Sequence, residues 1–328
     1  MPSAPNILFL MTDQMQGRVL DPQHPCITPT FDKLAARGVR ITNAYTPNPV
    51  CSPARASLMT GLLPHSHRVV AVTHCLPEDM GCIDRDRAHW AQSLASSGYK
   101  TGYFGKWHVE RSETPTDFGW QHFEKPDKWG PGDVESEQKI TGIEGYPDHR
   151  LYGIATSPPE ERFVGKTTTA ALDWLDGQLN SHEPWCCFVS VIEPHDPFVC
   201  GRDAFAQYDV DALPVPDNWT DDLDNRPGLY RKAARVFRDL TLEQKKQAAA
   251  CYYAMITEVD QQYARLIDRL EQAGQLDNTI IILTSDHGEM LGAHGLYMKN
   301  VGAFEEAYHI PMLAAGPGIA QGKTAHAR

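Results

Sequence analysis

The sequence lacks the features that mark several specialised classes of protein. Its eight cysteines form no Cys-x-x-Cys pair and are too sparse for a disulfide framework, which indicates a reducing compartment. No apolar run approaches the length of a membrane-spanning helix, and the apolar stretch at residues 7–11 is too short for a signal peptide. We therefore expect a cytoplasmic protein without a membrane partner.

Basic residues are also scarce: 30 lysines and arginines stand against 42 aspartates and glutamates, and the formal net charge is −12. General nucleic-acid binding usually requires a basic surface, so we expect no nucleic-acid partner. A small anionic substrate is compatible with this charge, because a binding site can be locally basic inside an acidic protein.

Apolar strand-like runs alternate with helical patterns along the chain. This repeated strand–loop–helix order predicts an α/β fold with a mostly parallel central sheet flanked by helices on both faces. No linker or internal repeat divides the chain, so we expect one domain over residues 1–328, with long irregular segments at 111–165 and 198–240. The predicted strands are residues 6–11, 39–45, 99–104, 185–192, 278–284 and 310–315, and the predicted helices are residues 28–37, 53–60, 87–97, 167–179 and 242–273.

Cys51 ends an extended segment and is followed by Ser-Pro-Ala-Arg-Ala-Ser-Leu-Met-Thr-Gly. Ser52 is predicted to cap a helix that begins at Pro53, so that backbone N–H groups and the positive end of the helix dipole converge on Cys51. Arg55 lies one turn into this helix and can reach the same point, which would suit an anion beside a nucleophile. Free cysteines are more often buried and structural. A cysteine-phosphatase loop needs a longer spacing than the three residues between Cys51 and Arg55.

Polar residues follow four of the predicted strands. In open α/β sheets, ligands bind beyond the carboxyl ends of the strands, so parallel neighbours would bring these residues together. Each group alone is weak evidence, because a strand-end aspartate more often caps a helix and a lone histidine more often lies in a turn. The four groups are Asp13 with Gln14, Lys106 with His108, His195, and Asp286 with His287.

Some of these residue types suit a divalent cation. Asp13, Gln14 and Asp286 offer oxygen ligands, which favour Ca²⁺ or Mg²⁺, while the nitrogen of His287 also suits Mn²⁺ or Zn²⁺.

The remaining groups suit the binding and transfer of an oxyanion. Arg55, Lys106 and Lys299 supply cationic donors, and His108 and His195 supply groups for proton transfer near neutral pH. A metal, cations and a nucleophile together indicate transfer of a sulfuryl or phosphoryl group.

The motifs resemble those of the sulfatase family over essentially the whole chain. CSPAR followed by ASLMTG resembles the signature Cys-x-Pro-[Ser/Ala]-Arg, and NILFLMTDQ resembles the family's N-terminal metal-binding strand. GKWH, EPHDPF, SDHGEMLGAHG and Lys299 then follow in the family's order. The resemblance implies an alkaline-phosphatase-like fold and hydrolysis of small-molecule sulfate esters.

In such enzymes the signature cysteine, here Cys51, is oxidised to formylglycine by a maturation enzyme, and the aldehyde is present as its hydrate. One hydroxyl attacks sulfur with activation by the metal and Asp286, and the second later releases sulfate. The resemblance further implies that Arg55 stabilises the hydrate and that Lys106 and Lys299 bind the sulfate oxygens. It implies that His108 accepts a proton and that His195, with Lys299, assists the leaving group. It also implies a metal ion, Ca²⁺ ahead of Mg²⁺ or Mn²⁺, bound by Asp13, Gln14, Asp286, His287 and the modified Cys51.

Two pairs depart from many sulfatases, which carry a second aspartate in place of Gln14 and an asparagine in place of His287. The pairs here look more like those of choline sulfatases and phosphonate monoester hydrolases, whereas GKWH at 105–108 looks more like a sulfatase. Hydrolysis of phosphonate monoesters or phosphodiesters at the same site is therefore the alternative function, and an inactive binding protein on the same scaffold is a third hypothesis.

The family normally continues into a small C-terminal antiparallel domain that this chain does not reach, so we expect a truncated sequence. The irregular segments could wall the substrate pocket, and their aromatic residues could hold a cationic group such as choline. These residues are Trp120, Trp129, Tyr146 and Trp219.

Overall fold

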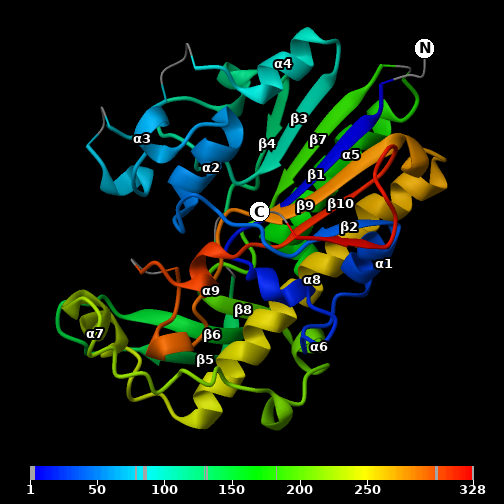
Figure 1. The fold of residues 1–328 in the computed structure, drawn as a ribbon. Helices are drawn as coiled ribbons and strands as arrows, with labels where there is room; N and C mark the ends of the chain where they lie inside the picture. Colours follow the sequence, from blue (N-terminus) through cyan, green and yellow to red (C-terminus); the bar gives the residue numbers. More distant parts are fainter. Residues whose placement is uncertain are drawn as a thin grey trace.

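An eight-stranded sheet runs through the computed structural model in the order β11-β2-β10-β9-β1-β7-β3-β4 (Figure 1). The central strands β9, β1, β7, β3 and β4 are parallel, whereas β10 is antiparallel to both β9 and β2. The structure describes residues 4–77, 80–83, 87–128, 130, 132–181, 183–299 and 302–326. The strands of this sheet are β1 (Asn6–Thr12), β2 (Gly38–Ile41), β3 (Lys100–Gly105), β4 (His122–Glu124), β7 (Trp185–Ser190), β9 (Thr279–Ser285), β10 (Met312–Ala315) and β11 (Lys323–Ala325).

Helices cover both faces of this sheet, as predicted. Successive side chains of a strand point to opposite faces. On β1, Leu8 and Leu10 join the core beneath α1 (Pro29–Arg37), α5 (Phe163–Gln178) and α8 (Leu242–Gln272), whereas Phe9 and Met11 join a second core beneath α2 (Cys51–Thr60) and α4 (Trp90–Ser96). A strand buried on both faces reads as a continuous apolar run, which is why residues 6–11 were recognisable from sequence.

Shorter helices complete the described part of the chain. The α-helices are α3 (Pro64–His67), α6 (Arg202–Phe205), α7 (Gly228–Ala234) and α9 (Glu305–Tyr308), and the 3₁₀ helices are Gly17–Leu20, Thr73–Cys75, Pro115–Phe118, Pro159–Glu161, Val210–Ala212, Leu276–Asn278 and Ala293–Gly295. None of the helices in the described ranges is both long and apolar enough to cross a membrane.

The two segments predicted to be irregular contribute a second sheet, so that prediction was wrong in part. Strands β5 (Val134–Ile140), β6 (His149–Ala155) and β8 (Phe198–Gly201) pair in that order, and α8 packs against β6 and β8. Most side chains of β5 are exposed or half-buried and polar, so its sequence shows no apolar alternation. Only the pairing with β6 and the support of α8 reveal these residues as strands.

Helix α2 begins at Cys51 with Val50 as its N-cap, so the predicted cap at Ser52 and start at Pro53 were wrong. Pro53 is the third helical residue, where its missing N–H costs nothing, because the first four N–H groups of a helix have no partner within the helix. The hydroxyl of Ser52 instead accepts a hydrogen bond from the backbone N–H of Thr73 at 3.3 Å. Cys51 therefore lies within the first helical turn.

Other helix and strand boundaries differ from the predicted ones by a few residues. Helix α4 begins at Trp90 rather than residue 87, and α5 begins at Phe163 rather than residue 167. The predicted strand 39–45 pairs over Gly38–Ile41 and then forms only an isolated bridge at Tyr45. Strand β11 was not predicted, because its three residues carry no apolar run.

Candidate active site

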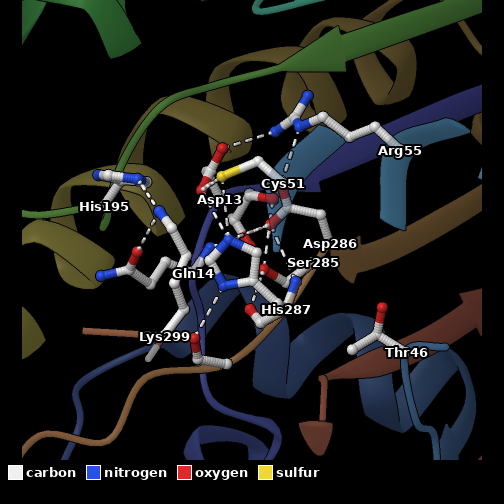
Figure 2. Close-up of polar contacts among 12 residues, drawn as sticks. Asp13, Gln14, Thr46, Cys51, Arg55, His195, Ser285, Asp286, His287 and Lys299 are labelled. Carbon is white, nitrogen blue, oxygen red and sulfur yellow. Dashed lines mark hydrogen bonds and ion pairs between the residues drawn. The ribbon is translucent and has the colours of Figure 1, made fainter. Parts of the chain in front are cut away.

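The carboxyl ends of β1, β3, β7 and β9 lie at one edge of the large sheet. Figure 2 shows the polar residues that follow β1, β7 and β9 gathered there, and Lys106, which follows β3, contacts Asp13. Gly105, the last residue of β3, has φ +94°, and an added Cβ would lie 2.1 Å from the carbonyl oxygen of Ser190 on β7. Only glycine permits this approach, which is held by the hydrogen bond from Lys106 N to Ser190 O at 2.8 Å. Lys106 consequently enters the site from the strand end.

Four buried side chains form a cluster of metal-ligand type. Asp13, Cys51, Asp286 and His287 each place one potential ligand atom within 4.8 Å of the others. The thiol sulfur of Cys51 lies 3.1 Å from Nε2 of His287 and 3.6 Å from Oδ1 of Asp13. Two carboxylates, an imidazole and a position for a further donor form a set that fits a divalent cation.

Arg55 explains how two carboxylates can share this buried site. Its guanidinium donates to Oδ2 of Asp13 at 3.0 Å and to Oδ2 of Asp286 at 2.7 Å, and its Nη1 donates to Lys106 O and to the hydroxyl of Ser190. The ammonium of Lys106 also contacts Oδ2 of Asp13. In each carboxylate, Oδ2 thus contacts cationic side chains, and Oδ1 is turned toward the cluster, where it could bind a metal.

The ring of His287 is oriented for metal binding. Its Nδ1 lies 2.9 Å from the carbonyl oxygen of Gly288, so Nδ1 carries the proton and donates it there. Nε2 is left facing Asp13 at 3.4 Å and Asp286 at 3.7 Å. A backbone carbonyl that fixes the tautomer is the usual support of a metal-binding histidine.

The electrostatic surroundings of the cluster favour the charged forms of Cys51 and His287. Burial raises the pKa of the Cys51 thiol, but Lys106, Lys299 and His287 outweigh burial and hold that pKa well below its ordinary value. Burial lowers the pKa of His287, but Asp286 and Cys51 outweigh it and raise the pKa to about 9. Without a metal the imidazole thus holds a second proton, which a bound cation would displace.

The pKa values of the two carboxylates shift in opposite directions. Burial and Cys51 raise the pKa of Asp13, but Lys106, together with His195 and Arg55, brings it below the ordinary range. Burial and the neighbouring Asp13 raise the pKa of Asp286.

Gln14 is oriented by two residues that the sequence analysis did not single out. Its Nε2 donates to Oδ1 of Asp196 at 3.0 Å and to Oε2 of Glu289 at 2.6 Å. Its Oε1 is therefore turned inward, where it accepts a hydrogen bond from Lys299 at 3.2 Å. Burial raises the pKa of Glu289 to about 7. Glu289 stands four residues after Ser285 within the recognised motif, but the motif alone gives it no partner.

His195 and Lys299 lie together on the other side of the cluster (Figure 2). Nζ of Lys299 contacts Nε2 of His195, and Nδ1 of His195 lies 2.7 Å from the carbonyl oxygen of Asp196. Burial and Lys299 lower the pKa of His195, but Asp196, Asp13 and Cys51 raise it above its ordinary value. The pair forms a donor unit that faces the cluster.

His108 follows β3 in a left-handed conformation with φ 50°, and its side chain interacts with Cys51. Burial lowers its pKa, which favours a neutral ring able to accept a proton. Within the described residues its Nδ1 is buried without a hydrogen-bond partner, and its ring stacks on that of His74 at 5.7 Å.

The three aromatic residues that the structure describes, Trp120, Tyr146 and Trp219, do not assemble into one wall. Trp120 is buried in the core beneath α2 and α4, and the ring of Trp219 lies 3.5 Å from the ammonium of Lys245. Tyr146 lines a cavity beside the site, and Trp129 lies outside the described residues.

The chain is similar to sulfatases of known sequence. A choline-sulfatase of Rhizobium meliloti (strain 1021) is 31% identical over 352 residues that cover 97% of this chain, and the uncharacterized sulfatase YidJ of Escherichia coli (strain K12) is 30% identical over 331 residues that cover 95%. The chain spans 64% and 63% of the lengths of these two relatives.

Solved structures share the fold. A phosphonate monoester hydrolase from Silicibacter pomeroyi matches 98% of this chain and 70% of its own with a TM-score of 0.79 and 25% identity. A putative sulfatase from Bacteroides fragilis matches 97% of this chain and 69% of its own with a TM-score of 0.73 and 27% identity. The model of the Sulfatase family matches residues 5–328, which include every residue of the cluster, and the chain therefore belongs to the sulfatase family.

Proposed function

We propose that residues 1–328 form a catalytic domain that hydrolyses small-molecule sulfate esters through a formylglycine made from Cys51. The observation that carries this proposal is the position of Cys51, buried in the first turn of α2 within 4.8 Å of three potential metal ligands. A purely structural cysteine has no need of that setting. A maturation enzyme that recognises the unfolded Cys-Ser-Pro-Ala-Arg stretch would be the required partner.

Asp13, Gln14, Asp286, His287 and the modified Cys51 would hold the cation, which would act as a Lewis acid toward the ester's oxygens. The oxygen-rich donor set favours Ca²⁺, with Mg²⁺ or Mn²⁺ as alternatives. Arg55 favours the ionised form of both carboxylates, Lys106 favours that of Asp13, and Arg55 stabilises the hydrate beside them.

The formylglycine hydrate would supply one hydroxyl to attack sulfur and a second whose deprotonation releases sulfate. Asp286 helps to deprotonate the first hydroxyl, and neutral His108 accepts the proton of the second. Lys106 and Lys299 bind the sulfate oxygens. His195 and Lys299, which share one hydrogen bond, would together supply the proton that the departing alcohol oxygen takes up.

Mass spectrometry of the peptide that contains residue 51 tests the nucleophile. Replacement of the thiol by an aldehyde lowers the mass by about 18 Da. Cys51→Ala should reduce turnover of a nitrophenyl sulfate more than about a hundredfold, whereas Cys75→Ala, at an exposed cysteine, should not. Retention of more than about a hundredth of the rate in Cys51→Ala would place the nucleophile elsewhere.

A phosphonate monoester or phosphodiester hydrolase is the second candidate. The similarity to the Silicibacter pomeroyi enzyme and the pairs Asp13-Gln14 and Asp286-His287 favour it. Specificity between the two esters depends on how much positive charge surrounds the oxyanion. Rates measured on sulfate and phosphonate esters of one nitrophenol decide between them: much faster turnover of the phosphonate would overturn the sulfatase proposal.

An inactive binding protein on the same scaffold is the third candidate. It predicts an unshifted peptide mass at residue 51 together with no hydrolysis of either ester. The same two measurements therefore distinguish it.

A further inference from the structure

A cavity of about 1210 Å³ opens directly beside His195 and Lys299. It is lined by the connection between β5 and β6 at residues 142–146, by α7 and by the chain that follows α7. Its position next to the proposed proton donor makes it the space into which the alcohol part of a substrate would extend. A cavity of this size holds a larger group than a methyl or ethyl alcohol.

The lining combines flat apolar surface with positive charge. Tyr146, Phe237 and Met298 supply the apolar part. Four cationic side chains stand against three carboxylates, in a chain whose formal net charge is −12. The cationic side chains are Lys232, Arg235, Arg238 and Lys299, and the carboxylates are Glu144, Asp196 and Asp239.

Two of these cations form no ion pair with any residue that the structure describes. Asp239 lies 3.5 Å from Arg238, and Asp196 is held by Gln14 and His195. Across the described ranges, neither Lys232 nor Arg235 lies within ion-pairing distance of a carboxylate.

The neighbouring Arg231 shows what a structural arginine does here. Its Nη1 donates to the backbone carbonyls of Leu223, Asp224 and Arg226, and so holds the preceding turn. Lys232 and Arg235 make no such bond within the described part of the chain. Cations also favour the C-terminal end of a helix such as α7, but that effect needs no cavity and explains only part of their placement.

We propose that this cavity binds the alcohol part of the substrate, and that this alcohol carries a second anionic group, a sulfate or carboxylate, which Lys232 and Arg235 bind. This inference rests on the proposed function and adds the class of substrate to it. An ester of a quaternary amine such as choline would meet the positive charges of Lys232 and Arg235 here and would be disfavoured.

Three phenyl sulfates that differ in one ring substituent provide the test. The substituent is a carboxymethyl, a neutral carboxamidomethyl or a trimethylammoniomethyl group. We expect kcat/KM for the carboxymethyl ester to exceed that of the neutral ester by about fivefold or more, and the cationic ester to be the poorest. The preference should shrink as ionic strength rises from about 0.1 to about 1 M, because the Debye length falls from about 10 to about 3 Å.

The double variant Lys232→Gln/Arg235→Gln should bring the ratio of carboxymethyl to neutral ester close to one. The matched control is Lys33→Gln/Lys166→Gln, which removes the same charge from exposed positions on α1 and α5 and should leave the ratio unchanged. An equal change of the ratio in both double variants would overturn the proposal, since it would show an effect of net charge.

Binding is measured separately from turnover with the Cys51→Ala variant. Calorimetric titration of this variant with the three esters should give the same order of affinity. Equal Kd values for the carboxymethyl and neutral esters would overturn the proposal even if all three esters are hydrolysed. Selective binding without hydrolysis of any ester by the matured wild type would instead overturn the proposed function and leave this inference supported.

Discussion

The carboxylate of Glu289 accepts a 2.6 Å hydrogen bond from Nε2 of Gln14, a residue 275 positions earlier in the chain. Its other oxygen accepts from the backbone N–H groups of Leu291 and Met298, at 2.8 and 2.6 Å. Among the described residues, every donor that reaches this carboxylate is thus an N–H group. Glu289 thereby joins the end of β1 to the segment that carries Lys299.

Glu289→Gln should reverse the amide of Gln14. The side-chain oxygen of the new glutamine would face the two backbone N–H groups, and its NH₂ would meet Nε2 of Gln14. That donor-to-donor contact is relieved if Gln14 rotates its amide, which turns NH₂ instead of Oε1 toward the proposed metal. We expect Ca²⁺ affinity, measured by calorimetric titration, to fall by about 10- to 100-fold.

Glu271→Gln, at an exposed position on α8, serves as the control for loss of a carboxylate. It should leave Ca²⁺ affinity as in the wild type. An unchanged affinity in Glu289→Gln would mean that Gln14 takes no part in holding the metal.

The sequence predicted the strands that carry the site better than the residues that support it. Asp13 and Asp286 were recognisable because each follows an apolar run that is buried on both faces. Glu289 and Asp196 were not recognised as supports, because their partner Gln14 is distant in the chain and no local pattern encodes that pairing. The second sheet was missed for the same reason, since β5 becomes a strand only through β6.

Arg55→Gln should destabilise the chain strongly, because it leaves Asp13 and Asp286 buried without their shared guanidinium. Removal of one partner of a buried ion pair typically costs about 3–5 kcal/mol. Urea unfolding measures this cost, and added Ca²⁺ should recover part of it by neutralising the same carboxylates. The control Arg202→Gln breaks the surface pair with Glu135 and should cost at most about 1 kcal/mol. A cost below about 1 kcal/mol for Arg55→Gln would show that the two carboxylates do not depend on this arginine.

Two glycine substitutions should have opposite effects on stability. Gly105→Ala places a methyl group 2.1 Å from Ser190 O in a backbone with φ +94°, so β3 and β7 must separate where Lys106 enters the site. We expect a loss of more than about 2 kcal/mol in the free energy of unfolding. Gly177→Ala, in α5, meets no atom within 4 Å and should stabilise by about 0.4–1 kcal/mol. Similar values for both variants would contradict the close approach at Gly105.

Asp260, which contacts the start of α1, should make a pH-dependent contribution to stability. It accepts hydrogen bonds from the backbone N–H groups of Thr30 and Phe31 at 3.1 and 2.8 Å, and burial raises its pKa to about 6. Because an unfolded aspartate has a pKa of about 3.9, the folded chain binds this proton more tightly; the resulting stabilisation is complete below about pH 4 and is lost as the pH rises through about 6. The free energy of unfolding relative to Asp260→Asn should therefore fall by about 2 kcal/mol between about pH 4.5 and 7.5, measured by urea unfolding. Asp268→Asn, exposed on the same helix, is the control, and its free energy of unfolding should differ from that of the wild type by less than about 0.5 kcal/mol at each pH. A pH-independent difference between the wild type and Asp260→Asn would refute the raised pKa.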